Sequence, residues 1–154
     1  MIDRERLKEL KRKNAISNVC KRWKNNDISI NLEDFLDIKE TIYLQDIIMK
    51  KLEEMDRDNM SIVYEEQEPN ILSIFQETLI SNIDRSETYV FFKNEAVETG
   101  GIKLKGITIE KKLEFIMSES EFYYNGCSVF FSSINGDKGI CIWMGEYDNR
   151  IYVW

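Results

Sequence analysis

The last residues of the chain, KGICIWMGEYDNRIYVW (138–154), contain the pattern that decides the fold. Ile140 and Ile142 alternate with Cys141 and Trp143, so both faces of this segment are apolar. A strand that is apolar on both faces is typical of the centre of a sheet that is covered on both sides. The closing IYVW repeats the two-sided pattern. We therefore predict two adjacent strands, which form the end of a sheet meander.

The two faces of these strands are expected to have different neighbours. The aliphatic face belongs to the core and comprises Ile140, Ile142, Ile151 and Val153. The aromatic face carries Trp143, Tyr152 and Trp154. Two alternatives remain open for it: a basic N-terminal helix covers it, or it is partly open to a partner.

The rest of the chain predicts an α+β fold. Strand signals lie in MSIVYEE (60–66), TYVFFKN (88–94) and CSVFFSS (127–133), and helical periodicity in residues 3–24, 39–56, 69–83 and 108–120. Asn135-Gly136 is a strong hairpin signal, and Asp148-Asn149 is a second turn candidate. Gly100-Gly101 indicates a turn or a close backbone approach. We expect one domain, 1–154, with an antiparallel sheet mainly from residues 86–154, covered largely on one face by N-terminal helices.

The composition argues against most enzyme chemistry. The chain has no histidine, which removes the commonest general base and the commonest transition-metal ligand. Its three cysteines, Cys20, Cys127 and Cys141, are widely spaced and form no zinc motif, which is typical of reduced thiols. Nucleotide-binding glycine motifs are missing as well. We expect no cofactor, no metal and no catalytic residue.

Charge is distributed unevenly along the chain. Residues 1–24 have a net charge of +6, whereas the remaining 130 residues have a net charge of −13. An acidic body repels nucleic acid and attracts basic proteins. The basic segment is interpreted as a solvated helix that docks by a thin apolar stripe, with an RNA- or membrane-binding arm as the alternative. Neither a membrane span nor a secretory signal is evident, so we expect a cytoplasmic protein.

Three acidic and aromatic segments are the candidate binding sites. They are YEEQEP (64–69), SESEFYYNG (118–126) and GEYDN (145–149), with one tryptophan on the adjacent strand. Carboxylates steer the approach of a basic surface, and aromatic rings supply rigid contact area. The candidate contact residues are Glu65, Glu66, Glu68, Glu119, Glu121, Tyr123, Tyr124, Trp143, Glu146, Tyr147 and Asp148.

The order of these features resembles a family of small bacterial immunity proteins of polymorphic toxin systems. It includes contact-dependent inhibition immunity proteins and the YxiF-like group. The segments that carry the resemblance are LKELKRKNAISNV, TYVFFKNEAVETGGIKLKG, LEFIMSESEFYYNGCSVFFSS and the C-terminal stretch quoted above. The resemblance implies a cytoplasmic inhibitor of a cognate toxin domain, with nucleases, including tRNA-cleaving ones, as frequent targets. From the acidic body and the lack of a long apolar run, we expect no membrane partner and no direct nucleic-acid partner.

Two other classes of function remain open. A nucleic-acid-binding adaptor would use the basic residues 4–24, and its binding would weaken steeply with salt. A histidine-free enzyme would use carboxylates or tyrosines, with a raised-pKa glutamate in a deep pocket as its signature.

Overall fold

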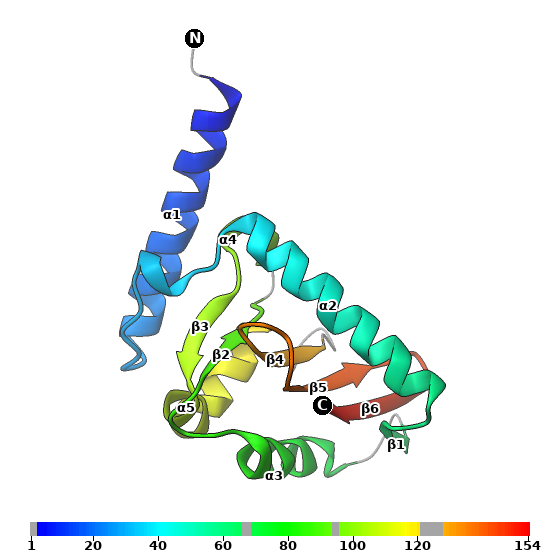
Figure 1. The fold of residues 1–154 in the computed structure, drawn as a ribbon. Coiled ribbons are helices and arrows are strands. Elements are labelled where there is room, and N and C mark those ends of the chain that lie inside the picture. Colours follow the sequence, from blue (N-terminus) through cyan, green and yellow to red (C-terminus); the bar gives the residue numbers. More distant parts are fainter. Residues whose placement is uncertain (1–2, 66–68, 94–95, 121–127) are drawn as a thin grey trace.

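The fold is α+β, as the sequence predicts, and consists of one antiparallel sheet with helices on both of its faces (Figure 1). The computed structural model describes residues 3–65, 69–93, 96–120 and 128–154. The helices are α1 (Arg4–Lys24), η1 (Leu32–Asp34, a 3₁₀ helix), α2 (Ile38–Arg57), α3 (Ile71–Asn82), α4 (Ala96–Thr99) and α5 (Gly106–Glu119). The strands are β1 (Ile62–Glu65), β2 (Thr88–Phe91), β3 (Ile102–Lys105), β4 (Val129–Ser133), β5 (Gly139–Met144) and β6 (Asp148–Val153).

The sheet has the strand order β1-β6-β5-β4-β2-β3. Strands β4, β5 and β6 form the predicted antiparallel meander, in which Ile142 lies opposite Ile151 and Cys141 opposite Tyr152. Strand β1 comes from the N-terminal half and pairs with β6 at one edge. The strand that is apolar on both faces, β5, lies inside the sheet between β4 and β6, as its pattern indicates.

One predicted turn is confirmed and one is wrong. Gly136 has a φ of +78° in the connection between β4 and β5, as expected for Asn135-Gly136. Asp148 and Asn149, however, belong to β6, because both pair with β1 on one side. The turn lies just before them, at residues 145–147, and the Gly145 amide donates to the Asp148 carbonyl at 2.8 Å.

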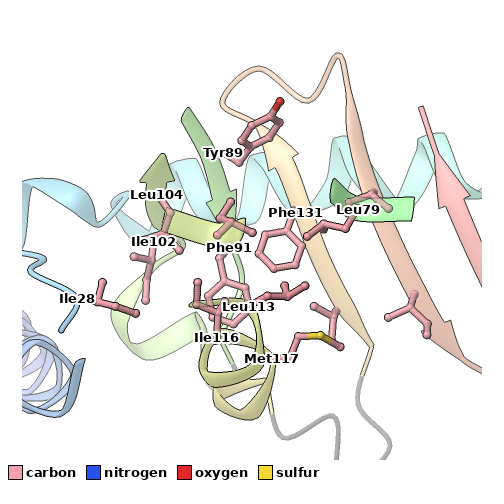
Figure 2. Close-up of a cluster of buried hydrophobic side chains, with 14 of the residues drawn as sticks. Ile28, Leu79, Tyr89, Phe91, Ile102, Leu104, Leu113, Ile116, Met117 and Phe131 are labelled. Carbon is pink, nitrogen blue, oxygen red and sulfur yellow. The ribbon is translucent and has the colours of Figure 1, made fainter. Parts of the chain in front are cut away.

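The aliphatic face of the sheet is in the main core, as predicted. Its side chains pack with those of α1, α3 and α5 in one cluster (Figure 2). Phe91 stacks on Phe131 with ring centroids 5.5 Å apart, and Trp23 of α1 lies 6.1 Å from Phe91. Trp23 is fully buried, so the C-terminal half of α1 is an integral part of this core.

Helix α2 covers part of the aromatic face, so the first of the two alternatives, cover by the basic N-terminal helix, is wrong. Leu44, Ile48 and Leu52 of α2 pack with Cys141 and Tyr152 in a second cluster. Helices therefore cover both faces and are not confined largely to one. The reason lies in the periodicity of α2, whose buried residues recur every three or four positions along one side.

Local sequence signals account for several element boundaries. Helix α2 begins after Asp37, whose carboxylate accepts from the Glu40 amide, while Glu40 accepts from the Asp37 amide. Gly100 has a φ of +91°, and a Cβ atom there would collide with the Leu36 carbonyl oxygen. Gly100-Gly101 is thus a close backbone approach, as predicted. None of the helices among the described residues has the length and apolar character needed to cross a membrane.

Candidate binding groove beside helix α2

A groove runs along one flank of α2, where the helix leaves part of the aromatic face of the sheet uncovered. We call it the α2 groove. Its apolar half has a volume of about 250 Å³ and is lined by Gln45, Ile48, Met49, Phe92 and Phe130. Its acidic half has a volume of about 320 Å³ and is lined by Met49, Leu52, Glu53, Asp56, Trp143, Asp148, Arg150 and Tyr152. Met49 lines both halves, so the two halves adjoin.

A row of aromatic rings forms the sheet side of the groove. Phe92 follows β2, Phe130 lies on β4 and Trp143 on β5, so the row crosses neighbouring strands. The Phe92 and Phe130 rings are 6.4 Å apart at an interplanar angle of 88°, and Phe130 and Trp143 are 6.2 Å apart at 76°. Edge-to-face contacts of this kind hold rings in fixed orientations. Phe130 and Trp143 are only partly buried, so the row forms an apolar surface that is partly open to solvent.

The helix side of the groove is apolar and acidic. Ile42, Asp46, Met49 and Glu53 follow one another at intervals of three or four residues, which places them along one flank of α2. All four side chains are exposed. Because Asp46 and Glu53 lie on either side of Met49, this flank combines an apolar centre with negative charge. No lysine or arginine occupies any of the four positions.

A hydrogen-bonded network closes the acidic half. Asp56 accepts from Tyr152 Oη at 2.8 Å and from Arg150 Nη1 at 3.0 Å, and Arg150 Nη2 donates to Asp148 at 3.1 Å. The carboxylates of Asp148 and Asp56 raise the pKa of Arg150. Burial, followed by the neighbouring Asp56, raises the pKa of Tyr152, so its hydroxyl stays protonated and remains a donor. With Glu53, three carboxylates face one guanidinium, which leaves this half with excess negative charge.

The structure brings part of the predicted site together. Trp143 and Asp148 both line the acidic half of the groove. Glu146 and Tyr147 lie in the adjacent turn between β5 and β6, where both are exposed and Tyr147 is 80% exposed. Trp143 and Asp148 thus share the groove, whereas Glu146 and Tyr147 are outside its lining and next to Asp148 in the chain.

Glu119 lies elsewhere and has partners within the chain. Its carboxylate, at the end of α5, accepts from Arg22 Nη2 at 2.6 Å and from Trp23 Nε1 at 2.8 Å. The side chain is only 11% exposed. It therefore fastens α1 to α5, and a contact with a partner protein remains a prediction for this residue.

The other predicted contact residues lie wholly or partly outside the residues that the structure describes. The backbone of Glu65 pairs with Asp148 across β1 and β6, at the same end of the sheet as the groove. The residues outside the described ranges are Glu66, Glu68, Glu121, Tyr123 and Tyr124.

Sequence reasoning missed the α2 side of the groove. The helical pattern of residues 39–56 predicts an inward-packing apolar face, and it gives no role to Met49, Glu53 and Asp56 on the neighbouring flank. The signal that identifies them is the acidic and apolar spacing on the neighbouring flank, from Ile42 to Glu53. The alternation around Phe130 predicts a strand, and it does not indicate that this ring lines a groove.

The polar groups that line the acidic half are carboxylates, one guanidinium and one phenol, and most of them are hydrogen-bonded to one another. Among the residues that the structure describes, no three His, Cys, Asp or Glu side chains are grouped as metal ligands. The thiol of Cys141 on this face is buried, and burial raises its pKa well above the ordinary value. The groove can instead bind a surface that carries cations around an apolar centre.

Comparison with known families gives one result. Residues 19–154 match the family described as YxiF protein. Neither the curated proteins nor the solved structures include a significant match.

Proposed function

We propose that this chain, which belongs to the YxiF family, is an immunity protein that binds a basic toxin domain and neutralises it. The toxin domain that we propose as the target is a nuclease, and tRNA-cleaving nucleases are included in this class. Inhibition would follow from covering the active site or the substrate-binding surface of the toxin. No catalysis by the chain itself is involved.

The observation that carries this proposal is the composition of the α2 groove. Its centre consists of Met49, Phe130 and Trp143, and Glu53 and Asp148 line its acidic half. Asp46 is exposed on the same flank of α2 as Met49 and Glu53, by its spacing along the helix. Protein interfaces obtain most of their binding energy from a few buried aromatic or arginine anchors. An aromatic centre with a carboxylate rim therefore suits a partner that presents an apolar anchor between lysines or arginines.

The charge of the whole body supports a nuclease as the partner. A nuclease has to be basic where it holds the phosphate backbone. Residues 25–154 have a net charge of −13, so encounter with such a surface is accelerated by long-range attraction. The same charge disfavours direct binding of nucleic acid by the body.

Co-expression with the toxin domain encoded beside this gene tests the proposal. We expect the chain to protect cells from the toxin and to co-purify with it as a stable complex. Protection should be lost in an Asp46→Lys, Glu53→Lys variant, because both changes place cations on the rim of the groove. The matched control is Glu77→Lys, Glu114→Lys, which makes the same charge change on α3 and α5.

The location of the contact can be read from three variants. A second reversal, Glu65→Lys with Glu66→Lys and Glu68→Lys, probes the predicted acidic segment after β1. If only this triple variant loses protection, the toxin contact lies at that segment and the α2 groove is not the site. Cells that remain unprotected by the wild-type chain, with no complex formed, would refute the immunity proposal itself.

A further inference from the structure

Helix α1 has an inner side and an outer side that differ in exposure to solvent. Ile16, Val19 and Trp23 are 3%, 3% and 0% exposed and dock the C-terminal half of the helix in the core. Residues 3–11 are all exposed, and Figure 1 shows this first half of α1 standing away from the rest of the molecule. We call residues 3–11 the arm; it ends where Arg12 Nη2 donates to the Leu36 carbonyl oxygen at 3.0 Å.

Two leucines of the arm face away from the body. Leu7 precedes Ile16 by nine residues, and Leu10 precedes Val19 by nine. Nine residues correspond to about two and a half helical turns, which places each leucine on the side opposite its buried counterpart. Leu7 and Leu10 are 43% and 48% exposed, consistent with this placement. By helical spacing, Arg6 and Lys11 flank the pair on either side, and Lys11 also lines a cavity between α1 and the start of α2.

The flank of α2 that borders the groove has the complementary pattern. Met49 is apolar and exposed, and Asp46 and Glu53 lie on either side of it. The two carboxylate positions are about 10 Å apart along the helix, and Arg6 and Lys11 are about 8 Å apart along theirs. Leucines of the arm can therefore meet Met49 and Phe130 while the charges pair on both sides. This is the helix-in-groove mode of recognition.

The arm cannot reach the groove of its own chain. α1 packs in the cluster on the aliphatic face of the sheet, whereas α2 packs in the cluster on the opposite face. The leucines also point away from the body. Two arms do not suit each other either, because residues 1–24 have a net charge of +6 in each copy and would repel. The surface that suits the arm is therefore the α2 groove of a second copy.

We propose that the arm of one copy binds the α2 groove of a second copy. Such a contact is heterologous, with different surfaces on the two partners, and it leaves a free arm and a free groove at the ends. The contact is weakened by salt, since exposed charge pairs carry part of it. This inference does not depend on whether a toxin also uses the groove.

Sedimentation velocity of the full chain tests the self-association. The wild-type protein should associate increasingly with concentration at low salt and should dissociate at high salt. Leu7→Ser with Leu10→Ser should weaken association at least about tenfold, as for central apolar anchors of an interface. Ile80→Ser, which changes an equally exposed apolar residue on α3, is the control and should leave association unchanged.

A mixing experiment identifies the two surfaces. The first variant, Arg6→Glu with Lys11→Glu, has a defective arm and an intact groove. The second, Asp46→Lys with Glu53→Lys, has an intact arm and a defective groove. Each should be monomeric alone, and their mixture should form a one-to-one dimer and nothing larger.

Three results would overturn the proposal. They are a wild-type chain that stays monomeric at every concentration in low salt, association that survives both charge reversals, and a mixture of the two variants that remains monomeric. All changed side chains are exposed, so circular dichroism should show that each variant keeps the native fold.

Discussion

Tyr152 on the last strand donates a hydrogen bond of 2.8 Å to Asp56 in the last turn of α2. Arg150 from the same strand donates to the same Asp56 oxygen at 3.0 Å. The two bonds fasten the end of α2 to β6. They hold the helix at a fixed distance from the aromatic row and so keep the groove open on one flank.

Removing the Tyr152 hydroxyl should therefore destabilise the fold modestly. In Tyr152→Phe the ring and its packing are retained, and Asp56 keeps Arg150 as a partner. We expect the free energy of unfolding to fall by about 1 kcal/mol, the typical net value of one hydrogen bond. Urea denaturation measures this. Tyr147→Phe, at a position that is 80% exposed, should change it little, and an equal loss in both variants would contradict the role given to Tyr152.

Glu119 should contribute more to stability than an ordinary surface carboxylate. In Glu119→Ala the indole N–H of fully buried Trp23 loses its acceptor, and Arg22 loses its bidentate partner. We expect a loss of about 2 kcal/mol, because an unsatisfied buried donor retains its full desolvation cost. The comparison is Glu110→Ala, which removes the exposed pair with Arg85 and should cost about 0.5 kcal/mol or less. Equal losses would mean that the Trp23 bond adds nothing.

Gly100 should not tolerate a side chain. Gly100→Ala combines an unfavourable positive φ with a collision between the new Cβ and the Leu36 carbonyl oxygen. We expect destabilisation by about 2 kcal/mol or more, visible as a lower midpoint of thermal unfolding. Lys105→Ala, at an exposed position at the end of β3, should have little effect. A Gly100→Ala protein as stable as the wild type would show that the backbone relaxes freely here.

The turn before β2 should give the stability a specific pH dependence. Asp84 accepts hydrogen bonds from the hydroxyl and the amide of Ser86, and these bonds lower the pKa of Asp84 below 3.8. When the pKa of a carboxyl group is lower in the folded state than in the unfolded state, the group stabilises the fold at pH values above its unfolded-state pKa. This stability is lost as the pH falls through the folded-state pKa. Asp84→Ala should thus be destabilising at neutral pH, and the difference from wild type should shrink below about pH 4. Urea titrations across this range measure it, and a difference that grows as the pH falls would contradict the assignment.

Much of the fold follows from local patterns. The periodicity predicts a helix over 39–56, and α2 occupies Ile38–Arg57. The meander of β4, β5 and β6 follows from alternation and from Asn135-Gly136. These signals are local in the sequence: residue spacing, a capping pair and one turn dipeptide. The assignment of Ile140, Ile142, Ile151 and Val153 to the core follows from the same alternation.

The incorrect expectations concern tertiary structure, namely which strands pair and which helix packs on which face of the sheet. Asp148 and Asn149 have turn propensity, but pairing with β1 and β5 draws them into β6. The aromatic face could be covered by either of two amphipathic helices, and periodicity cannot say which helix lies over which face. The groove could not be predicted for a related reason. It arises from the flank of α2 next to a row of rings from three strands, and no single stretch of sequence contains both.

The central claim is that the α2 groove binds a basic toxin. Its most direct test is the rate at which the chain associates with the toxin domain encoded beside this gene. The measurement is stopped-flow fluorescence, with the partly buried Trp143 as a reporter, over a range of salt concentrations. We predict a rate that falls as salt increases, and a rate for Asp46→Lys, Glu53→Lys at least about tenfold lower than for the Glu77→Lys, Glu114→Lys control. Equal rates for the two variants, or no binding by the wild-type chain, would contradict the account.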